Sequence, residues 1–207
     1  MILSFANGKK NILRGSDNIF KKIEDITKKY EKNTLKQIIL VKGNRLYFFN
    51  KKNDKWNIEI ETDCYIGRNG FSSNRHSGDL TTPLGFYKIL YAFGTDEQIN
   101  SNIKYKKITY NSYFSDDEEN LKQYNTWVES NKPINGEHLI DYPKEYHYGM
   151  VIGFNINPKI KGKGSSIFLH CKGNKTYTSG CIAIDEKIIV KILEKIDKMV
   201  YIIIMSN

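Results

Sequence analysis

The stretch that decides the fold runs from residue 165 to residue 205 and reads SSIFLHCKGNKTYTSGCIAIDEKIIVKILEKIDKMVYIIIM. Near its two ends lie the apolar residues IFL (167–169) and YIII (201–204), which are rich in the β-branched and aromatic residues that favour strands. Between them, residues 185–199 place apolar side chains at helical spacing, at Ile188, Ile189, Ile192, Leu193, Ile196 and Met199. The stretch therefore predicts a strand, a loop with a short apolar segment, a helix and a last strand.

The rest of the chain adds mostly strands to this frame. Residues 35–67 predict three strands joined by two turns, and residues 81–94 and 146–157 predict further strands. The polar residues 116–130 are compatible with a short helix. We expect a mostly β (α+β) fold that ends in a helix and a strand.

An amphipathic helix is predicted at residues 16–32, before the first strand. Its apolar face carries Ile19, Ile23, Ile26 and Tyr30, and Ser16 or Asp17 can cap its start. We predict an N-terminal helical extension at residues 1–34 and a single β-rich domain at residues 35–207.

Composition and charge narrow the function classes. The 207 residues are 40% hydrophobic and 27% charged, as in a soluble globular protein, and the net charge is +9. A basic surface suggests an anionic environment, such as nucleic acid, anionic lipid or an acidic cell-wall polymer. The lysines are scattered, however, and neither zinc-finger nor RNA-recognition spacing is present. No nucleic-acid partner is therefore predicted. No segment has the apolar length of a membrane span. The start, MILSFANGKK, lacks the order of a signal peptide, so we expect any export signal to have been trimmed or to lie outside this chain.

Two of the three cysteines flank a loop that follows a histidine, at His170, Cys171 and Cys181. A zinc site is disfavoured because adjacent residues of a strand point to opposite faces, which separates His170 from Cys171. A disulfide between Cys171 and Cys181 is compatible with the spacing but not dictated by it. Cys171 and Cys64 are expected to be small buried apolar residues.

Cys181 stands in a different context, because it follows the turn-prone TSG and precedes the apolar IAI. Small residues before a nucleophile let backbone N–H groups near Gly180 and Cys181 converge on a carbonyl oxygen. His170, at the end of the preceding strand, is a candidate base for the thiol. Spacing alone leaves catalysis by this pair and an inert buried cysteine equally open.

An ordered set of motifs resembles the YkuD-type L,D-transpeptidase catalytic domain. The set is GRNGF, GDLTTPLGFYKI, AFG, EHL, YGMVIGFN, GKGSSIFLHC and TSGC, and it runs from about Arg68 to Cys181. It is most similar to the branch with an upstream Gly-Asp-x-x-Thr-Pro-x-Gly-x-Phe segment. The resemblance implies an L,D-transpeptidase-like β-sandwich, which makes residues 35–207 the catalytic domain.

The resemblance implies acyl transfer on peptidoglycan stem peptides, in an exported, periplasmic or cell-wall-associated protein. Cys181 is then the nucleophile and His170 the base, a thioester is formed with loss of D-Ala, and no cofactor or metal is needed. An amine of a second stem completes a cross-link. The alternatives are hydrolysis, which makes an L,D-carboxypeptidase, and a wall-binding module without catalysis.

Further site residues follow from the same motifs. Ser179 and Gly180 are expected at the oxyanion hole, and Thr178 matches the residue that opens the last motif. Arg68, Glu137 and His138 are candidates for substrate binding. The chain departs from many members in having Ser179 in place of a second histidine and Ala183 in place of Asn or Arg. Asp79, Thr82, Pro83 and Gly85 are expected to shape one wall of the substrate groove.

Overall fold

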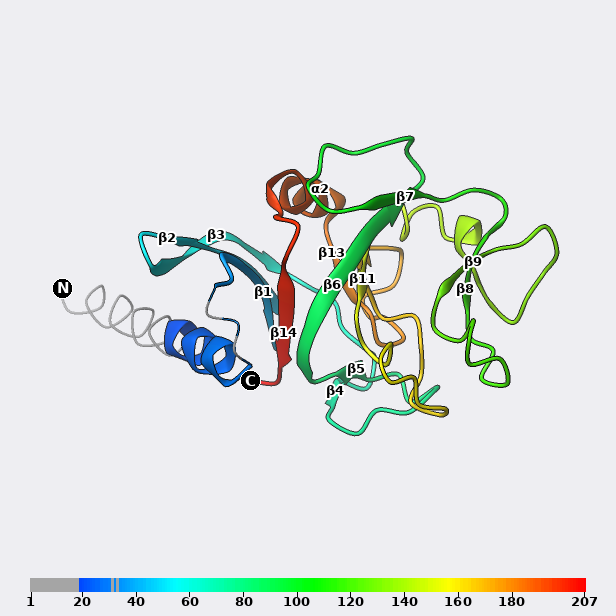
Figure 1. Ribbon diagram of the computed structural model, residues 1–207, viewed down its shortest axis with the longest axis horizontal. Helices are drawn as coiled ribbons and strands as arrows, with labels where there is room; N and C mark the ends of the chain where they lie inside the picture. The colour runs from blue at the N-terminus through cyan, green and yellow to red at the C-terminus, as the bar shows by residue number, and fades with distance from the viewer. Residues whose placement is uncertain (1–18, 31, 33) are drawn as a thin grey trace, which may run out of the picture.

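The computed structural model describes residues 19–30, 32 and 34–207 of the chain, so the predicted caps at Ser16 and Asp17 lie outside the described residues. A nine-stranded sheet dominates it (Figure 1). From one edge to the other its strands are β13 (Ile182–Ile184), β12 (Phe168–Cys171), β11 (Tyr148–Ile152), β6 (Gly85–Gly94), β14 (Tyr201–Met205), β1 (Gln37–Lys42), β2 (Arg45–Lys52) and β3 (Lys55–Asp63), with β7 (Tyr105–Lys107) beside β6.

Smaller elements surround this sheet. A three-stranded sheet has the order β10 (Gly136–His138), β8 (Ser112–Ser115) and β9 (Trp127–Glu129), and β4 (Phe71–Ser72) pairs with β5 (Thr82–Pro83). The helices are one over residues 19–29, the short 3-10 helix η1 (Leu139–Asp141) and α2 (Glu186–Lys195). In Figure 1 the helix at residues 19–29 and the β8–β9 region lie at opposite ends of the large sheet.

The large sheet curls until its two edges meet. Tyr65, just after β3, exchanges backbone hydrogen bonds of 2.8 and 2.9 Å with Ala183 of β13. Because unpaired strand edges leave backbone groups unsatisfied, this pairing stabilises the closed curvature. The expectation of a mostly β fold with an N-terminal and a C-terminal helix is confirmed.

The two faces of the sheet carry different layers. Alternation along β12 sends Leu169 and Cys171 into the main apolar core, where Ile192 of α2 also packs. Phe168 points to the opposite face and meets Phe114 of β8 with ring centroids 4.9 Å apart. The three-stranded sheet therefore packs on the face of β12 that is turned away from α2.

Two local predictions are wrong. Residues 116–130 form turns and β9 instead of a helix, because Asn125 has φ +53° and its side chain bonds the carbonyl oxygens of Phe154 and Asn155, both at 2.9 Å. The C-terminal helix ends at Lys195, so Met199 is not on its buried face and is 52% exposed.

The helix at residues 19–29 shares a core with the sheet. Ile23 is fully buried and packs in one cluster with Leu35, Phe49 and Ile203. Tyr30 lies just beyond the helix, is 46% exposed, and stacks on Phe86 with ring centroids 4.7 Å apart. The boundary between residues 34 and 35 stays a prediction.

Replacing Ile23 with alanine tests this packing. We expect Ile23→Ala to lower the free energy of unfolding by about 2–5 kcal/mol, because it removes a fully buried side chain from a shared core. Lys22→Ala, at an exposed position of the same helix, is the matched control and is expected to change it by about 0.5 kcal/mol or less. Urea denaturation measures both. Equal, small effects would show that the helix does not stabilise the domain.

Candidate functional site

Cys181 and His170 lie on the same face of the sheet. β12 and β13 run parallel with His170 opposite Ala183, and Cys181 is two residues before Ala183, so the pleat points both side chains the same way. Both line one cavity of about 320 Å³. Cys171 points to the other face, where its thiol donates to the carbonyl oxygen of Tyr148 at 3.4 Å. The structure therefore brings the predicted pair together and leaves Cys171 in the core.

The Cys181 thiol is held by backbone groups and is 8% exposed. It donates to the carbonyl oxygen of Ser166 at 3.1 Å and accepts the Phe168 N–H at 3.3 Å. Burial, assisted by the charge of Glu137, raises the pKa of Cys181 to about 12, although the Phe168 N–H and the charge of Arg75 act against the rise. The thiol is therefore protonated at neutral pH and needs a base to react.

The hydrogen bonding and the burial of His170 suit it to act as that base. Its Nδ1 lies 2.8 Å from the carbonyl oxygen of Cys171, which can only accept, so Nδ1 carries the proton and Nε2 is the acceptor. Burial lowers the pKa of His170, with this hydrogen bond and the charge of Glu145 opposing, so the ring is neutral at pH 7. Its ring packs edge-on against Tyr146 at 5.5 Å. Within the described part of the chain no hydrogen bond joins the ring to the Cys181 thiol.

The turn before Cys181 is fixed by Thr178. The Thr178 hydroxyl donates to the carbonyl oxygen of Cys181 at 2.6 Å and accepts the Gly180 N–H at 3.1 Å. The Gly180 amide is thus occupied, whereas among the described residues no acceptor contacts the N–H of Ser179 or Cys181. Gly180 has φ +139°, and a Cβ on it would lie 2.8 Å from the carbonyl oxygen of Thr81. Only glycine fits this close approach.

Glu137 of β10 forms the opposite wall of the cavity. Its carboxylate accepts the Tyr146 hydroxyl at 2.5 Å. Burial raises the pKa of Glu137 to about 7, against the lowering effect of this hydrogen bond. Across residues 19–30, 32 and 34–207 no ion pair is formed by Glu137, and its carboxyl, which titrates near neutral pH, lines the same cavity as the thiol.

Arg68 and His138 do not line this cavity. Both ring nitrogens of His138 are engaged, with Nε2 2.7 Å from the carbonyl oxygen of Tyr110 and Nδ1 3.2 Å from Asp141 Oδ1. Arg68 is exposed and lines a neighbouring cavity of about 630 Å³, which shares Tyr177 with the first. Thr178 and Glu137 are thus the substrate-binding candidates that lie beside the cysteine.

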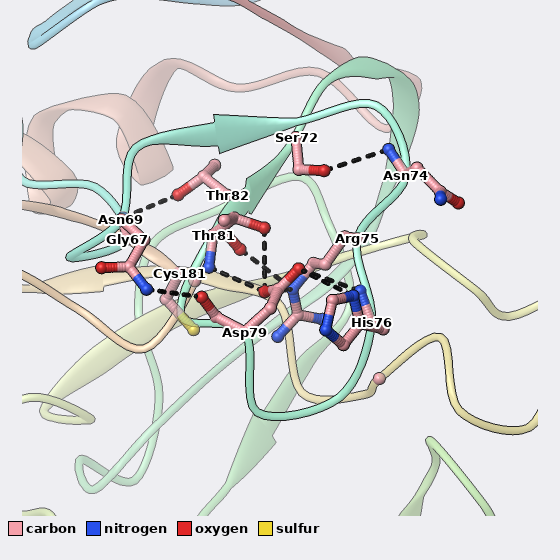
Figure 2. A network of polar contacts seen from close by, with 12 residues as sticks. Gly67, Asn69, Ser72, Asn74, Arg75, His76, Asp79, Thr81, Thr82 and Cys181 are labelled. Carbon is pink, nitrogen blue, oxygen red and sulfur yellow. Dashed lines mark hydrogen bonds and ion pairs between the residues drawn. The ribbon is translucent and has the colours of Figure 1, made fainter.

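The loop at residues 78–83, which reads Gly-Asp-Leu-Thr-Thr-Pro, packs against the turn that precedes Cys181 (Figure 2). Asp79 accepts the N–H groups of His76 and Thr81 and the Thr81 hydroxyl, at 2.8–2.9 Å. Arg75 donates through Nε to the carbonyl oxygen of Thr81 at 2.9 Å, and its guanidinium lies against Gly180. The sequence does not single out Arg75, because an arginine in a polar run is typical of a solvated loop and nothing in the spacing signals its burial.

The described residues hold no group of three or more His, Cys, Asp or Glu placed to bind a metal ion. All three cysteines are free thiols. No described helix is both long and apolar enough to cross a membrane.

Neutralising Glu137 tests its electrostatic link to the thiol. We expect Glu137→Gln to lower the pKa of Cys181 and to speed its alkylation by iodoacetamide about threefold or more at pH 8. As the pH falls from 7 to 6 the difference should shrink, because the wild-type carboxyl becomes protonated and no longer opposes the thiolate. Peptide mass mapping measures the rate.

Glu194→Gln, an exposed change of the same charge on α2, is the control. A Glu137→Gln rate that matches this control from pH 6 to pH 9 would contradict the link.

Comparisons with known proteins agree with this architecture. The family profile described as L,D-transpeptidase catalytic domain (YkuD) matches residues 36–204. Among solved structures, the helical cell shape determining protein Pgp2 of Campylobacter jejuni has a TM-score of 0.50 at 17% identity, covering 83% of this chain and 48% of its own. Bd1075 of Bdellovibrio bacteriovorus has a TM-score of 0.47 at 15% identity, with 82% and 48% covered.

An L,D-transpeptidase of Enterococcus faecium has a TM-score of 0.41 at 12% identity, with 83% and 50% covered. The chain therefore spans about half the length of these structures. A search of the curated proteins gives no match. The profile match covers well over half of the chain, and the Pgp2 structure shares its fold. The chain belongs to the L,D-transpeptidase catalytic domain family.

Proposed function

We propose that this chain is a cysteine-dependent L,D-transpeptidase that acts on peptidoglycan stem peptides. The observation that carries the proposal is the placement of Cys181 and His170 in one cavity, with a neutral imidazole whose Nε2 is free to accept a proton. Membership of the family gives the substrate class. The net charge of +9 is compatible with an anionic cell wall.

In the first half-reaction His170 Nε2 takes the proton of the Cys181 thiol, and the sulfur attacks the stem carbonyl that precedes the terminal D-Ala. The free N–H groups of Ser179 and Cys181 supply two donors next to the nucleophile, so they are the groups that would hold the developing oxyanion. The bond to D-Ala then breaks and His170 returns its proton to the leaving amine. A thioester on Cys181 remains.

In the second half-reaction an amine from another stem attacks the thioester. His170 accepts a proton from that amine, the carbon–sulfur bond breaks as the new peptide bond forms, and His170 returns the proton to the sulfur, which restores the thiol and the neutral imidazole. When water takes the place of the amine, the same steps make an L,D-carboxypeptidase. Both products come from one acyl-enzyme, so the proposal rests on the first half-reaction.

Assembled peptidoglycan lies outside the cytoplasmic membrane, so the proposal implies that the protein works there, in the periplasm or the cell wall. Pgp2, which shares the fold, is described as determining helical cell shape. We propose a comparable contribution to cell-wall construction for this chain.

Release of D-Ala from a purified tetrapeptide stem tests the proposal. We expect wild type to release it, and Cys181→Ala and His170→Ala each to lose about a thousandfold or more of the rate, because nucleophile and base act as one unit. Cys171→Ala is the matched control, since this thiol lies one residue from His170 but faces the main core. Mass spectrometry separates the cross-linked dimer from the hydrolysed tripeptide.

Retained D-Ala release in a folded Cys181→Ala variant would overturn the proposal. A wild type that binds isolated cell wall but releases no D-Ala would favour the wall-binding module instead.

A further inference from the structure

The Arg75 guanidinium is buried and incompletely satisfied. The side chain is 7% exposed, and Nη1 has no hydrogen-bond partner among the described residues. Taking a charged group out of water is costly unless its hydrogen bonds are replaced. A buried donor without a partner therefore calls for an explanation in terms of what the group does.

The acidic groups around Arg75 accept no hydrogen bond from its Nη1. Asp79 Oδ1 lies 3.7 Å from Arg75 Nε, but the Asp79 carboxylate is already hydrogen-bonded within its own loop. Asp116 accepts the hydroxyl groups of Ser165 and Ser166. The Tyr124 hydroxyl donates to Glu118 at 3.3 Å. Asp79 thus forms an ion pair with Arg75, but Nη1 remains without a hydrogen-bond acceptor among the described residues.

The guanidinium packs against the turn that precedes Cys181. A Cβ on Gly180 would lie 3.1 Å from Arg75 Nη2 and 2.8 Å from the carbonyl oxygen of Thr81, which accepts from Arg75 Nε. Figure 2 draws the Arg75 guanidinium, its hydrogen bond to Thr81 and the Cys181 side chain in one view. Arg75 thus packs on the residue that precedes Cys181 and fixes the carbonyl group that confines it.

The charges that act on the Cys181 sulfur come from two directions. Glu137, on β10, raises the pKa of the thiol, and Arg75, from the loop before β5, lowers it. His170 of β12 faces the same cavity but is neutral when the thiol reacts. Arg75 is therefore a positive charge that is present before the proton leaves the sulfur.

We propose that Arg75 is a positioning residue for Cys181. Its guanidinium packs against the Ser179–Cys181 turn and keeps it in place. Its positive charge stabilises the negative charge that forms on Sγ when His170 removes the proton. The step is a proton transfer from Sγ to His170 Nε2, with the sulfur keeping the electron pair. The consequence for acyl transfer rests on the proposed function, whereas the effect on the thiol is measurable without any substrate.

The test is the pH dependence of Cys181 alkylation by iodoacetamide, followed by peptide mass mapping from pH 6 to pH 10. We expect Arg75→Met to slow the reaction about tenfold throughout this range, because the pKa of the Cys181 thiol lies above it and a further rise of about one unit lowers the thiolate fraction tenfold. Arg75→Lys keeps the positive charge and is expected to recover most of the rate. Arg45→Met removes an exposed arginine on β2 and should leave the Cys181 profile unchanged.

Superimposable pH profiles for wild type and Arg75→Met would overturn the inference. An Arg75→Lys variant that is alkylated as slowly as Arg75→Met would also overturn it, because the positive charge at residue 75 would then be irrelevant. Should Arg75→Met fail to fold by circular dichroism, Arg75→Gln takes its place with the same expectations. If D-Ala release by Arg75→Met equals that of an active wild type and the profiles coincide, only the inference fails. A wild type whose Cys181 is alkylated faster than that of Arg75→Met but that releases no D-Ala overturns the proposed function and leaves the inference standing.

Discussion

The site depends on how the segment after Cys181 is held: its backbone pairs with a neighbouring segment on each side. Ala183 lies opposite His170 on one side and exchanges two hydrogen bonds with Tyr65 on the other. The first contact sets the thiol and the imidazole on one face, and the second closes the curl of the sheet. Because all these bonds are between backbone groups, side chains at Ser179 and Ala183 are free to differ from the family pattern while the placement of Cys181 is kept.

The electrostatics of the site follow from burial. A buried histidine whose Nδ1 is tied to a carbonyl oxygen stays neutral with Nε2 open, which is the state that a base requires. The same burial keeps the thiol protonated, so attack has to be coupled to proton transfer. Glu137 and Arg75 act on the sulfur in opposite senses, and the carboxyl of Glu137 changes charge near neutral pH. The reactivity of Cys181 is thus tuned by residues from β10 and from the loop before β5.

The sequence predicted the strands, the helix and the site residues that are specified by a local pattern of amino acids. Turn residues between alternating apolar runs located β1, β2 and β3, and helical spacing located α2. Ordered motifs located Cys181 and His170, which the structure places in one cavity. The strands β8, β9 and β10 were missed because each has three or four residues and depends on pairing between distant segments. The burial of Arg75 was also missed, since it depends on Gly164 and Gly180, which lie about a hundred residues away and lack the side chains that would exclude the guanidinium.

The central claim is that Cys181 is an activated, acyl-accepting nucleophile. Intact-protein mass spectrometry after incubation with a carbapenem tests it most directly, because such a β-lactam can acylate a reactive thiol and the mass reports each adduct. We expect a single adduct on wild type that peptide mapping places on Cys181 and that is absent from Cys181→Ala. An adduct of equal yield on Cys181→Ala, or no adduct on a folded wild-type protein, would contradict it.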